Sequence, residues 1–556
     1  MENQRLVLVI ALAFTAFLIW QQWITEHAPK PAPAAVATTA PATPGSAEAG
    51  RSDVPLAPGT PAATAQNSAL ARGARIKVTT DVYEAEIDSV GGDLRRIGLR
   101  RYPESLEQRE QPFVLMRDAG GEVFVAQSGL RAAKGAAPDH YAVYTAERSD
   151  YALTEGQDSL VVRLDWTDAS GVKVVKTYTF HRGSYVIDVA ETVENGSAED
   201  WQGVAYWQLQ REAPASSGGG IGQTYTYTGG IVSTPEKTYE KHSFDDLKKT
   251  PVNETVTGGW VAMIQHYFLG ALIPASQSER NVFYSLAVGG NRYVLGMSGA
   301  QLASVAPGAS STFQSKLYVG PKIQDRMAEV APHLELTVDY GKLTILAEPL
   351  FWALKHLHAL LGNWGWAIIV LTLLLKAAFY KLSETSYRSM ANMRKLGPKL
   401  QSLKERYGDD KQKLNQAMME MYRKEKINPL GGCLPIVVQI PVFIALYWML
   451  LESVELRQAP FMGWIQDLSV KDPYYVLPLI MGVSMFVQQK LSPAPPDPVQ
   501  AKVMMAMPVV FTFMFLWFPS GLVLYWVVNN CVSILQQWVI TKRIEAGEDK
   551  AAATSG

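Results

Sequence analysis

The sequence predicts a multi-domain membrane protein: a polytopic α-helical core of five helices, an N-terminal anchor helix, a large antiparallel β-sandwich domain and a charged helical hairpin. Two observations predict this class. Six apolar stretches are close to the ~20 residues that a helix needs to cross a bilayer; they cover residues 6–24, 364–382, 430–451, 474–491, 503–518 and 522–540. Between the first two stretches, apolar and polar residues alternate with a period of two, which is typical of strands.

Composition and charge exclude several other classes. The 556 residues have a net charge of -1, so the whole chain gives no argument for DNA as a partner. The two cysteines, Cys433 and Cys531, both lie in apolar stretches, which leaves the region outside the membrane without a disulfide. The sequence has no Walker-type glycine-rich motif, and its histidines lack metal-ligand spacing. We therefore expect no enzymatic activity, no cofactor and no metal.

The N-terminal stretch is expected to be an uncleaved anchor. It has the charged start and apolar core of a signal peptide, but it continues through Trp20 and Trp23 without a small-residue cleavage site directly behind it. Residues 28–74 are rich in Ala, Pro, Thr, Ser and Gly and contain few bulky apolar side chains. They predict an extended, mobile linker because they cannot form a core.

Residues 75–335 are expected to form the β-sandwich. The segments KVVKTYTF (173–180) and SYVIDV (184–189) alternate between apolar and polar residues, and turn-forming clusters such as ENGS (194–197) separate such segments. Many short strands separated by turns indicate antiparallel sheets. Aromatic residues of this region leave two interpretations open, since they line sugar-binding clefts but more often fill a core. They include Trp166, Trp201, Trp207 and Trp260.

Residues 336–362 are expected to form an amphipathic helix in the membrane interface. Apolar residues recur there at helical spacing beside Lys355 and His358. One continuous helix from 343 to 382 would be about 60 Å long, twice the hydrocarbon core. The stretch that follows contains Lys376, and a lysine inside a bilayer is costly. At this point Lys376 either snorkels to the headgroups or has a function within the membrane.

Residues 383–427 are expected to form a helical hairpin on the cytoplasmic side. Residues 381–426 carry twelve Lys or Arg and six Asp or Glu, and cytoplasmic loops are enriched in Lys and Arg. Apolar residues recur every three or four positions from Tyr387 to Tyr422, with a break at Gly408, and Pro398 should kink the first helix. The hairpin is either structural or a docking element for ribosomal RNA or anionic lipid.

Six ordered motifs resemble the YidC-type membrane protein insertases of Gram-negative bacteria, a family with mitochondrial and chloroplast relatives. The motifs are LYVGPK (317–322), VDYG (338–341), NPLGGCLP (428–435), VELRQAPF (454–461), DPYY (472–475) and LWFPSGLVLY (516–525). The resemblance implies an insertase and chaperone of the bacterial inner membrane, with both termini in the cytoplasm and a large periplasmic domain. Its clients would be nascent membrane proteins. Its partners would be the lipid bilayer, the Sec translocon with its accessory subunits, and the ribosome or signal recognition components at the hairpin.

The resemblance also implies five membrane helices around a hydrophilic groove that is open to the cytoplasm and to lipid but closed to the outside. The family places one cation in this groove, usually Arg, and Lys376 occupies that position here. The groove would hold the polar, often acidic, tail of a client. Other substrate-contact residues of the family fall on Thr372, Phe443 and Met481, and on Met514 and Trp526, where relatives often carry Phe and Tyr.

The expected division of the chain has six parts: anchor 1–27, linker 28–74, periplasmic sandwich 75–335, interfacial helix 336–362, membrane core 363–545 with the hairpin 383–427, and cytoplasmic tail 546–556. Two other functions are compatible with this architecture. One is a small-solute transporter with Lys376 as counter-ion, although the core stretches lack the related halves that such carriers show. The other is a carbohydrate-active periplasmic protein held by a membrane anchor.

Overall fold

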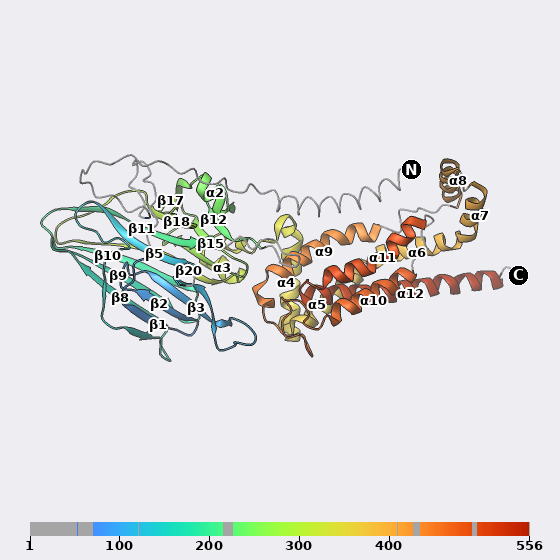
Figure 1. Cartoon of the computed structure of the whole chain (residues 1–556), viewed down its shortest axis with the longest axis horizontal. Helices are drawn as coiled ribbons and strands as arrows, with labels where there is room; N and C mark the ends of the chain where they lie inside the picture. The colour runs from blue at the N-terminus through green and yellow to red at the C-terminus, as the bar shows by residue number, and fades with distance from the viewer. Residues whose placement is uncertain are drawn as a thin grey trace, which may run out of the picture.

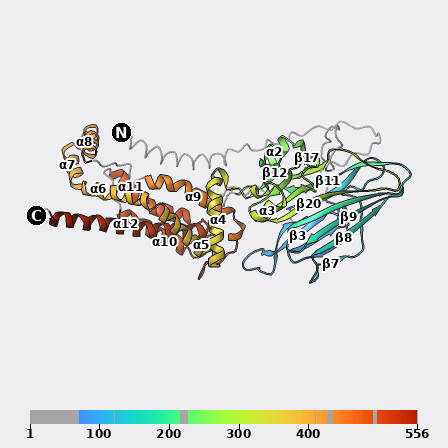
Figure 2. The ribbon, with the colours of Figure 1, turned by 180° about the vertical axis from the view of Figure 1, so that it is seen from behind.

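The computed structural model describes residues 53, 70–119, 122–214, 226–407, 410–425, 434–491 and 498–554. The predicted anchor, most of the predicted linker and residues 428–433 of the NPLGGCLP motif lie outside the described residues. The described chain has two parts (Figure 1): a β-sandwich at one end and a group of long helices at the other, with helix α4 (Thr344–Leu361) lying crosswise between them. Figure 2 shows the same arrangement from behind.

Two mainly antiparallel sheets form the sandwich, as the two-residue alternation predicts. In the described residues, the first sheet has eleven strands in the order β14-β17-β18-β11-β5-β3-β2-β1-β7, with β19 beside β11 and β4 beside β3. Its strands are β1 (Arg75–Thr79), β2 (Tyr83–Asp88), β3 (Leu94–Pro103), β4 (Pro112–Met116), β5 (Phe124–Lys134), β7 (Asp150–Ala152), β11 (Trp201–Glu212), β14 (Asn253–Thr257), β17 (Arg280–Ala287), β18 (Arg292–Gly299) and β19 (Ala303–Val305).

The second sheet has nine strands in the described residues, in the order β13-β12-β15-β16-β20-β10-β9-β8-β6. Its strands are β6 (Thr145–Ala146), β8 (Ser159–Thr167), β9 (Val172–His181), β10 (Val186–Asn195), β12 (Gly229–Ser233), β13 (Glu240–His242), β15 (Trp260–Ile264), β16 (Phe268–Pro274) and β20 (Ser310–Pro321). Strand β10 lies between β9 and β20, with Val189 opposite Tyr178 on one side and Ser315 on the other.

The core of the sandwich lies between the two sheets. Along β10, Ile187, Val189 and Val193 face inward and are at most 3% exposed, while Asp188, Ala190 and Thr192 are partly exposed. Burial of each such side chain contributes roughly 1.5–3 kcal/mol.

For four tryptophans the sequence allowed either a sugar-binding cleft or a position in the core. Three of the four lie in this core. Trp201 and Trp260 are fully buried, Trp207 is 5% exposed, and Trp166 is half-buried. The indole N–H of Trp201 donates to the carbonyl of Ala136, so its polar atom is also satisfied inside the domain. The structure therefore favours the core interpretation for these aromatic residues.

Most helices follow the sandwich in sequence. The short ones are α2 (Phe244–Lys249), α3 (Gln324–Val330), η1 (Leu334–Thr337), η2 (Gly341–Leu343) and η4 (Val454–Leu456). The long ones besides α4 are α5 (Trp364–Ala378), α6 (Tyr380–Lys395), α7 (Gly397–Tyr407), α8 (Lys411–Lys424), α9 (Leu434–Glu452), α10 (Val476–Leu491), α11 (Pro498–Phe515) and α12 (Ser520–Thr554). Helices α6 and α7 are separated next to Pro398, where the sequence predicts a kink.

Helix α4 has one buried face and one exposed face, and its place in a membrane interface stays a prediction. Its buried face includes Phe351 and Leu354, whereas Ile345 and Leu360 on the other face are 80% and 81% exposed. The helix ends at Gly362, whose φ of 68° is readily adopted by glycine. The chain then turns into α5, where the side chain of Asn363 accepts the N–H of Trp366 at 3.1 Å.

The first predicted core crossing ends earlier than expected. Residues 364–382 were predicted as one stretch, but α5 ends at Ala378 and α6 continues at a bend of 66°. The bend turns the last apolar residues of the stretch, Phe379 and Leu382, toward a cavity beside Lys376. Apolar content alone does not mark this bend, because the side chains on both sides of it are apolar.

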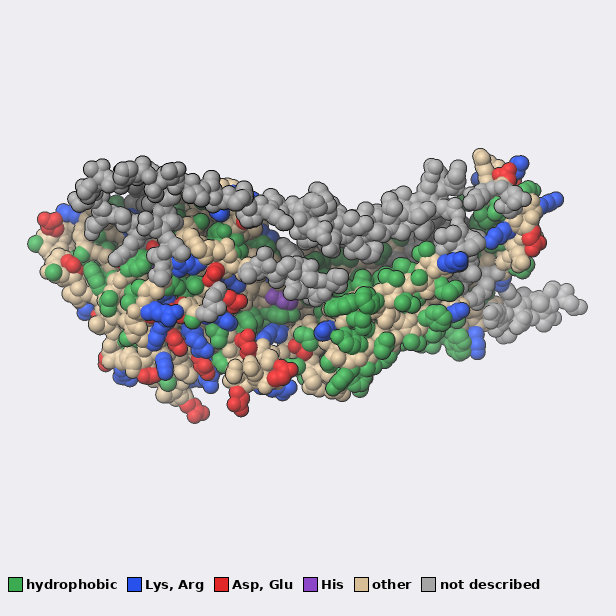
Figure 3. All heavy atoms as spheres, viewed as in Figure 1, with side chains coloured by type: hydrophobic (Ala, Val, Ile, Leu, Met, Phe, Trp, Pro, Cys, Tyr) green, Lys and Arg blue, Asp and Glu red, His purple; other side chains and the backbone are tan. Residues whose placement is uncertain are grey.

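The helical part carries a broad apolar surface (Figure 3). Exposed apolar residues of the helices include Leu373, Ile440, Val483 and Val509. Within the described residues, one helical segment, Ser520–Ile544, is long and apolar enough to cross a membrane. The bent pair of α5 and Tyr380–Met393 also meets this criterion if the two helices are counted as one span. The apolar segments Val437–Glu452, Val476–Leu491 and Ala501–Phe515 are shorter.

The sandwich contacts the helical part around the end of α9. The side chain of His266 donates from Nε2 to the carbonyl of Leu451 at 2.9 Å, and Lys322 pairs with the buried Glu452 at 3.9 Å. Beyond α9, Arg457 donates to the carbonyls of Pro103 at 2.8 Å and of Glu104 at 3.2 Å. These contacts join the sandwich directly to the helical part.

Candidate functional site

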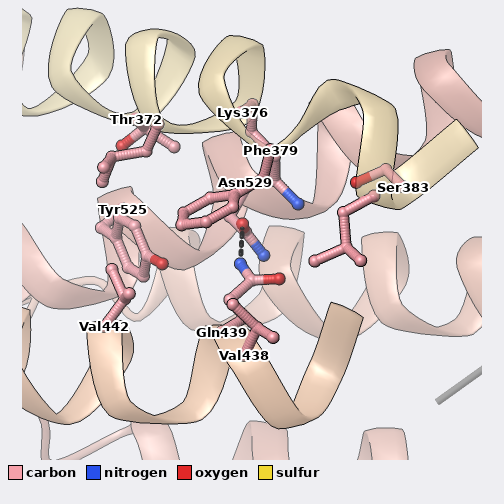
Figure 4. A pocket seen from close by; sticks show the side chains of 11 residues that line it. Thr372, Lys376, Phe379, Ser383, Val438, Gln439, Val442, Tyr525 and Asn529 are labelled. Atoms are coloured by element: carbon pink, nitrogen blue, oxygen red, sulfur yellow. Dashed lines mark hydrogen bonds between the residues drawn. The ribbon is translucent and has the colours of Figure 1, made fainter. Parts of the chain in front are cut away.

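A small cavity lies among α5, α6, α9 and α12 (Figure 4). Its walls combine the end of α5, the start of α6 and the facing sides of α9 and α12. The lining residues are Thr372, Leu375, Lys376, Phe379, Leu382, Ser383, Val438, Gln439, Val442, Tyr525 and Asn529. The space open to the centre of a water molecule is about 20 Å³, which exceeds the ~10–15 Å³ that one buried water needs.

Lys376 extends from α5 into the helix group instead of toward the headgroups. The residue is 8% exposed, and Nζ donates to the hydroxyl of Ser533 on α12 at 2.7 Å. Snorkelling, which the sequence left open, is therefore not the conformation of this side chain. Lys376 forms no ion pair within the described part of the chain, and two of the three ammonium protons have no hydrogen bond there.

Polar side chains of α12 follow one inward-facing stripe. Asn529, Ser533 and Gln537 are spaced by four residues, which places them on one face of the helix, and each is at most 9% exposed. Across the cavity, the amide of Gln439 on α9 donates to the side-chain oxygen of Asn529. The polar stripe is thus linked to α9 by the hydrogen bond of Asn529 and to α5 by that of Ser533.

The segment between α9 and α10 is held by hydrogen bonds against the starts of α10 and α12. The carboxylate of Asp472 is 1% exposed and accepts from Trp464 Nε1 at 3.0 Å and from the backbone N–H of Leu477 at 2.7 Å. The hydroxyl of Ser520, at the start of α12, donates to the carbonyls of Asp467 and Val470 at 2.8 and 2.9 Å. These bonds hold the segment against the helix ends.

The six predicted site residues occupy three different environments. Lys376 and Thr372 lie one helical turn apart on the cavity wall, and the Thr372 hydroxyl donates to the carbonyl of Ile368 on its own helix at 2.7 Å. Phe443 lies next to the cavity-lining Val442, and its ring meets that of Trp526 edge-on at 4.6 Å. The indole N–H of Trp526 has no hydrogen-bond partner within the described residues.

The two predicted methionines do not line the cavity. Met481 on α10 is fully buried, and Met514 on α11 is half-buried against the apolar core. Contact between Met481 and a client therefore requires α10 to separate from its neighbours. Client contact by either residue stays a prediction.

Sequence reasoning missed the polar partners of Lys376. Ser533, Asn529 and Gln439 carry the hydrogen bonds around the cavity, but none of them was singled out in the sequence. A signal was present: polar residues spaced by four within the apolar stretch 522–540, and one glutamine within 430–451. Polar side chains inside membrane helices usually face other helices or a cavity.

Comparisons with known proteins find relatives over nearly the whole length of the chain. The family "YidC periplasmic domain" matches residues 75–353, and the family "60Kd inner membrane protein" matches residues 356–548. A membrane protein insertase YidC from Nitrosococcus oceani is 54% identical over 551 residues, which cover 98% of this chain and 99% of that protein. A second, from Methylococcus capsulatus, is 51% identical over 560 residues, covering 99% of this chain and 100% of that protein.

A solved structure described as an active YidC insertase with its first transmembrane domain resolved also matches. It has 18% sequence identity and a TM-score of 0.38, and the match covers 85% of this chain and 94% of that chain.

Proposed function

This chain belongs to the YidC family of membrane protein insertases, and we propose that the cavity beside Lys376 is the place where it holds the polar tail of a client during insertion. The chain is an inner-membrane protein with a periplasmic domain, its role is insertion and not enzymatic catalysis, and its clients are nascent membrane proteins. The observation that supports the proposed site is a buried lysine, one hydrogen bond to Ser533, and a water-sized cavity beside it.

The charge of Lys376 suits an acidic client tail. An ammonium can donate three hydrogen bonds, and within the described residues one of them is used, so a carboxylate can take the others. At an effective dielectric constant near 20, a carboxylate about 4 Å from the ammonium gains roughly 4 kcal/mol. That gain offsets part of the cost of moving a charged tail into the membrane, and Gln439 and Asn529 supply further polar contacts for a hydrated segment.

Short helices also reduce the apolar distance that a tail crosses. Helix α10 has 16 residues and is therefore about 24 Å long, less than the ~30 Å of a typical hydrocarbon core. A bilayer thins locally around a short hydrophobic segment. A cavity that extends water partway into this thinner region shortens the barrier again.

The apolar wall beside the cavity offers a route into lipid. Phe443 and Trp526 form an aromatic pair, and Ile440, also on α9, is 50% exposed. As the apolar helix of a client leaves water, its burial contributes about 25 cal/mol per Å². We propose that this burial drives release of the client along Phe443 and Trp526, with Met481 and Met514 reached when α10 and α11 move apart.

The remaining expectations are part of the same proposal. Both termini and the hairpin α6 to α8 lie in the cytoplasm, where its Lys and Arg side chains dock the ribosome or signal recognition components. The groove is open toward the cytoplasm and lipid, and the bonds of Asp472 and Ser520 support closure on the periplasmic side. The protein works alone or with the Sec translocon and its accessory subunits. The six-part division of the chain from 1–27 to 546–556 follows from this topology.

Charge reversal at Lys376 tests the proposed site. Lys376→Glu should reduce insertion of a single-span client with an acidic tail by tenfold or more, because the tail then meets a like charge. The assay uses proteoliposomes that contain this chain as their sole protein, with insertion measured by protease protection of the tail.

The matched control is Lys376→Arg, which keeps the charge and should retain insertion. A second client with a neutral tail should depend less on the charge at 376. Insertion of the acidic-tail client by Lys376→Glu at the level of the unaltered protein would reject the cation as part of the site.

A further inference from the structure

A second pocket lies at the junction between the sandwich and the helical part. Its walls come from β4, the end of β11, the turn between β15 and β16, and the segment after α9. The space open to water centres is about 270 Å³, more than ten times that of the Lys376 cavity. We call it the junction pocket, and its key residues are Phe113, Arg211, Gln265, Phe268 and Arg457.

Two guanidinium groups give the junction pocket a positive charge. Arg457 lies over the rings of Phe113 and Phe268, with Cζ 5.4 and 5.6 Å from their centroids. Arg211 lies over the ring of Phe124 at 4.6 Å and donates to the side-chain oxygen of Gln265. Aromatic faces hold both side chains in place without neutralising them.

Neither guanidinium forms an ion pair with an Asp or Glu of the described residues. Their hydrogen bonds there go to neutral oxygens: the carbonyls of Pro103, Glu104 and Ile264 and the amide of Gln265. In the sequence, the residues between the lining residues Pro214 and Thr226 include no Asp or Glu. Partly buried cations without carboxylate partners are unusual in proteins, and an anion bound in the pocket would compensate both of them.

Other titratable groups leave the positive charge intact. Burial lowers the pKa of His266 to about 4, so this residue is neutral near pH 7. Burial also lowers the pKa of Arg211 to about 10, opposed by the more distant charge of Glu122, and the guanidinium stays protonated. For Arg457, burial lowers the pKa and the charge of Asp467 opposes this. The pocket therefore holds two cations across the physiological range.

The position of the pocket indicates which anion is available. His266, in its wall, donates to the carbonyl of Leu451 in the last turn of α9, so the pocket begins where a membrane helix ends. The helical part also carries exposed aromatic residues: Tyr474, just before α10, is 67% exposed, and Trp352 on α4 is 63% exposed. Tyr and Trp gather at the headgroup level of membranes.

We propose that the junction pocket binds the phosphate of an anionic phospholipid in the periplasmic leaflet, with Arg211 and Arg457 as its cationic ligands. Guanidinium groups match phosphate geometry and bind it with charge-assisted hydrogen bonds. The aromatic walls of Phe113 and Phe268 contact the apolar part next to the headgroup. A bound lipid then links the sandwich to the membrane helices. This proposal does not depend on the Lys376 site.

The test uses the purified full-length protein, stripped of lipid in detergent, with thermal unfolding as readout. Dioctanoyl phosphatidylglycerol should raise the Tm by several degrees, since a ligand that binds only the folded state stabilises it. Dioctanoylglycerol has the same chains without phosphate and should leave the Tm unchanged. An equal shift with dioctanoylglycerol, with inorganic phosphate alone or with an acidic peptide would overturn the assignment to a lipid phosphate.

Gln265→Glu tests the role of the two arginines without removing them. The new carboxylate pairs with Arg211 inside the pocket, so basal stability should be kept or increased while the lipid-induced shift is lost. Gln301→Glu, on the exposed surface of the sandwich, adds the same charge elsewhere and should keep the shift. A full lipid-induced shift in Gln265→Glu contradicts the proposal.

Lipid retention gives a readout that does not depend on stability. Native mass spectrometry should find phosphatidylglycerol retained by the unaltered protein and by Lys376→Glu, and lost from Gln265→Glu and from Arg457→Gln. Equal retention by all four proteins would overturn the junction pocket as a phospholipid site. If Lys376→Glu loses insertion but retains lipid, the client site beside Lys376 and the lipid site in the junction pocket are independent, and each proposal can fail without the other.

Discussion

Two buried lysines, one in the sandwich and one in the helical part, have opposite surroundings. Lys176 on β9 is fully buried and donates to the carbonyls of Gly91 at 2.7 Å and Ser128 at 2.8 Å, and it pairs with Glu191 at 3.3 Å. Lys376 on α5 is 8% exposed, has a hydroxyl partner at 2.7 Å, and lies beside a cavity. All three donors of Lys176 are used within the domain, whereas Lys376 uses one of its three within the described residues.

The difference separates a structural charge from a functional one. A buried lysine with a carboxylate and two carbonyls is fully compensated, so it holds strands together and has nothing left to bind. A buried lysine with one neutral partner and adjacent space is compensated only when water or a ligand enters. The surroundings of each lysine, and not its burial, indicate which of the two roles it has.

The largest expected effect is on the compensated lysine. Lys176→Met should lower the free energy of unfolding of the sandwich by about 3–5 kcal/mol, because it leaves the buried carboxylate of Glu191 without a cation. Thermal unfolding of the full-length protein, followed by the fluorescence of its buried tryptophans, measures this change. The double variant Lys176→Met with Glu191→Leu should recover much of the loss. If Lys176→Met were as stable as the unaltered protein, Lys176 would not be the structural charge that the comparison with Lys376 makes it.

The junction between the two regions supplies the next prediction, which concerns pH. His266 has a folded-state pKa of about 4, below its usual 6.5, because burial disfavours the charged ring. The folded state favours the neutral ring. The contribution of His266 to the free energy of unfolding is therefore complete above pH 6.5 and is lost as the pH falls toward 4. The loss should approach about 3 kcal/mol at pH 4.

The measurement compares the unaltered protein with His266→Gln, in which an amide N–H can still donate to Leu451. The unaltered protein should lose more stability than the variant between pH 6.5 and 4. Burial raises the pKa of Glu455 to about 7, and this acts in the opposite direction, but it is common to both proteins and cancels in their difference. Parallel stability curves for the two proteins would show that His266 does not titrate in this way.

The smallest expected effect concerns the partner of the functional lysine. Ser533→Ala removes the hydroxyl that accepts from Lys376 and should lower stability by about 0.5–1.5 kcal/mol, with insertion of an acidic-tail client reduced severalfold. Ser484→Ala is the matched control, because Ser484 is a buried serine on α10 that contacts Asn530 and does not line the cavity. If Ser484→Ala reduced insertion as much as Ser533→Ala, the insertion defects of both variants would be due to altered packing and not to the hydrogen bond of Lys376.

The parts that sequence predicted are those set by local pattern. Alternation along 173–189 predicted the strands of the sandwich, and helical spacing beside His358 predicted α4. The embedded Lys376 was found because one charge is conspicuous in an apolar stretch. These features depend on residues close together in the chain, where periodicity carries the information.

The parts that sequence did not predict depend on residues far apart. Ser533 reaches Lys376 across 157 positions, and Arg457 reaches Pro103 across 354. The bend after Ala378 and the full burial of Met481 depend on how helices pack, which the apolar pattern of one helix does not determine. The polar stripe of α12 was visible in the sequence, but its contact with the end of α5 was not.

The central claim is that the space beside Lys376 is wet, and aqueous thiol labelling tests it most directly. In a background with Cys433 and Cys531 replaced by serine, Lys376→Cys and Leu373→Cys are compared; Leu373 lies on the same helix, less than one turn away, and is 45% exposed on the apolar surface. A charged methanethiosulfonate reagent added from the cytoplasmic side should modify the cysteine at 376 at least tenfold faster than that at 373. Equal slow rates at both positions would contradict a hydrated cavity.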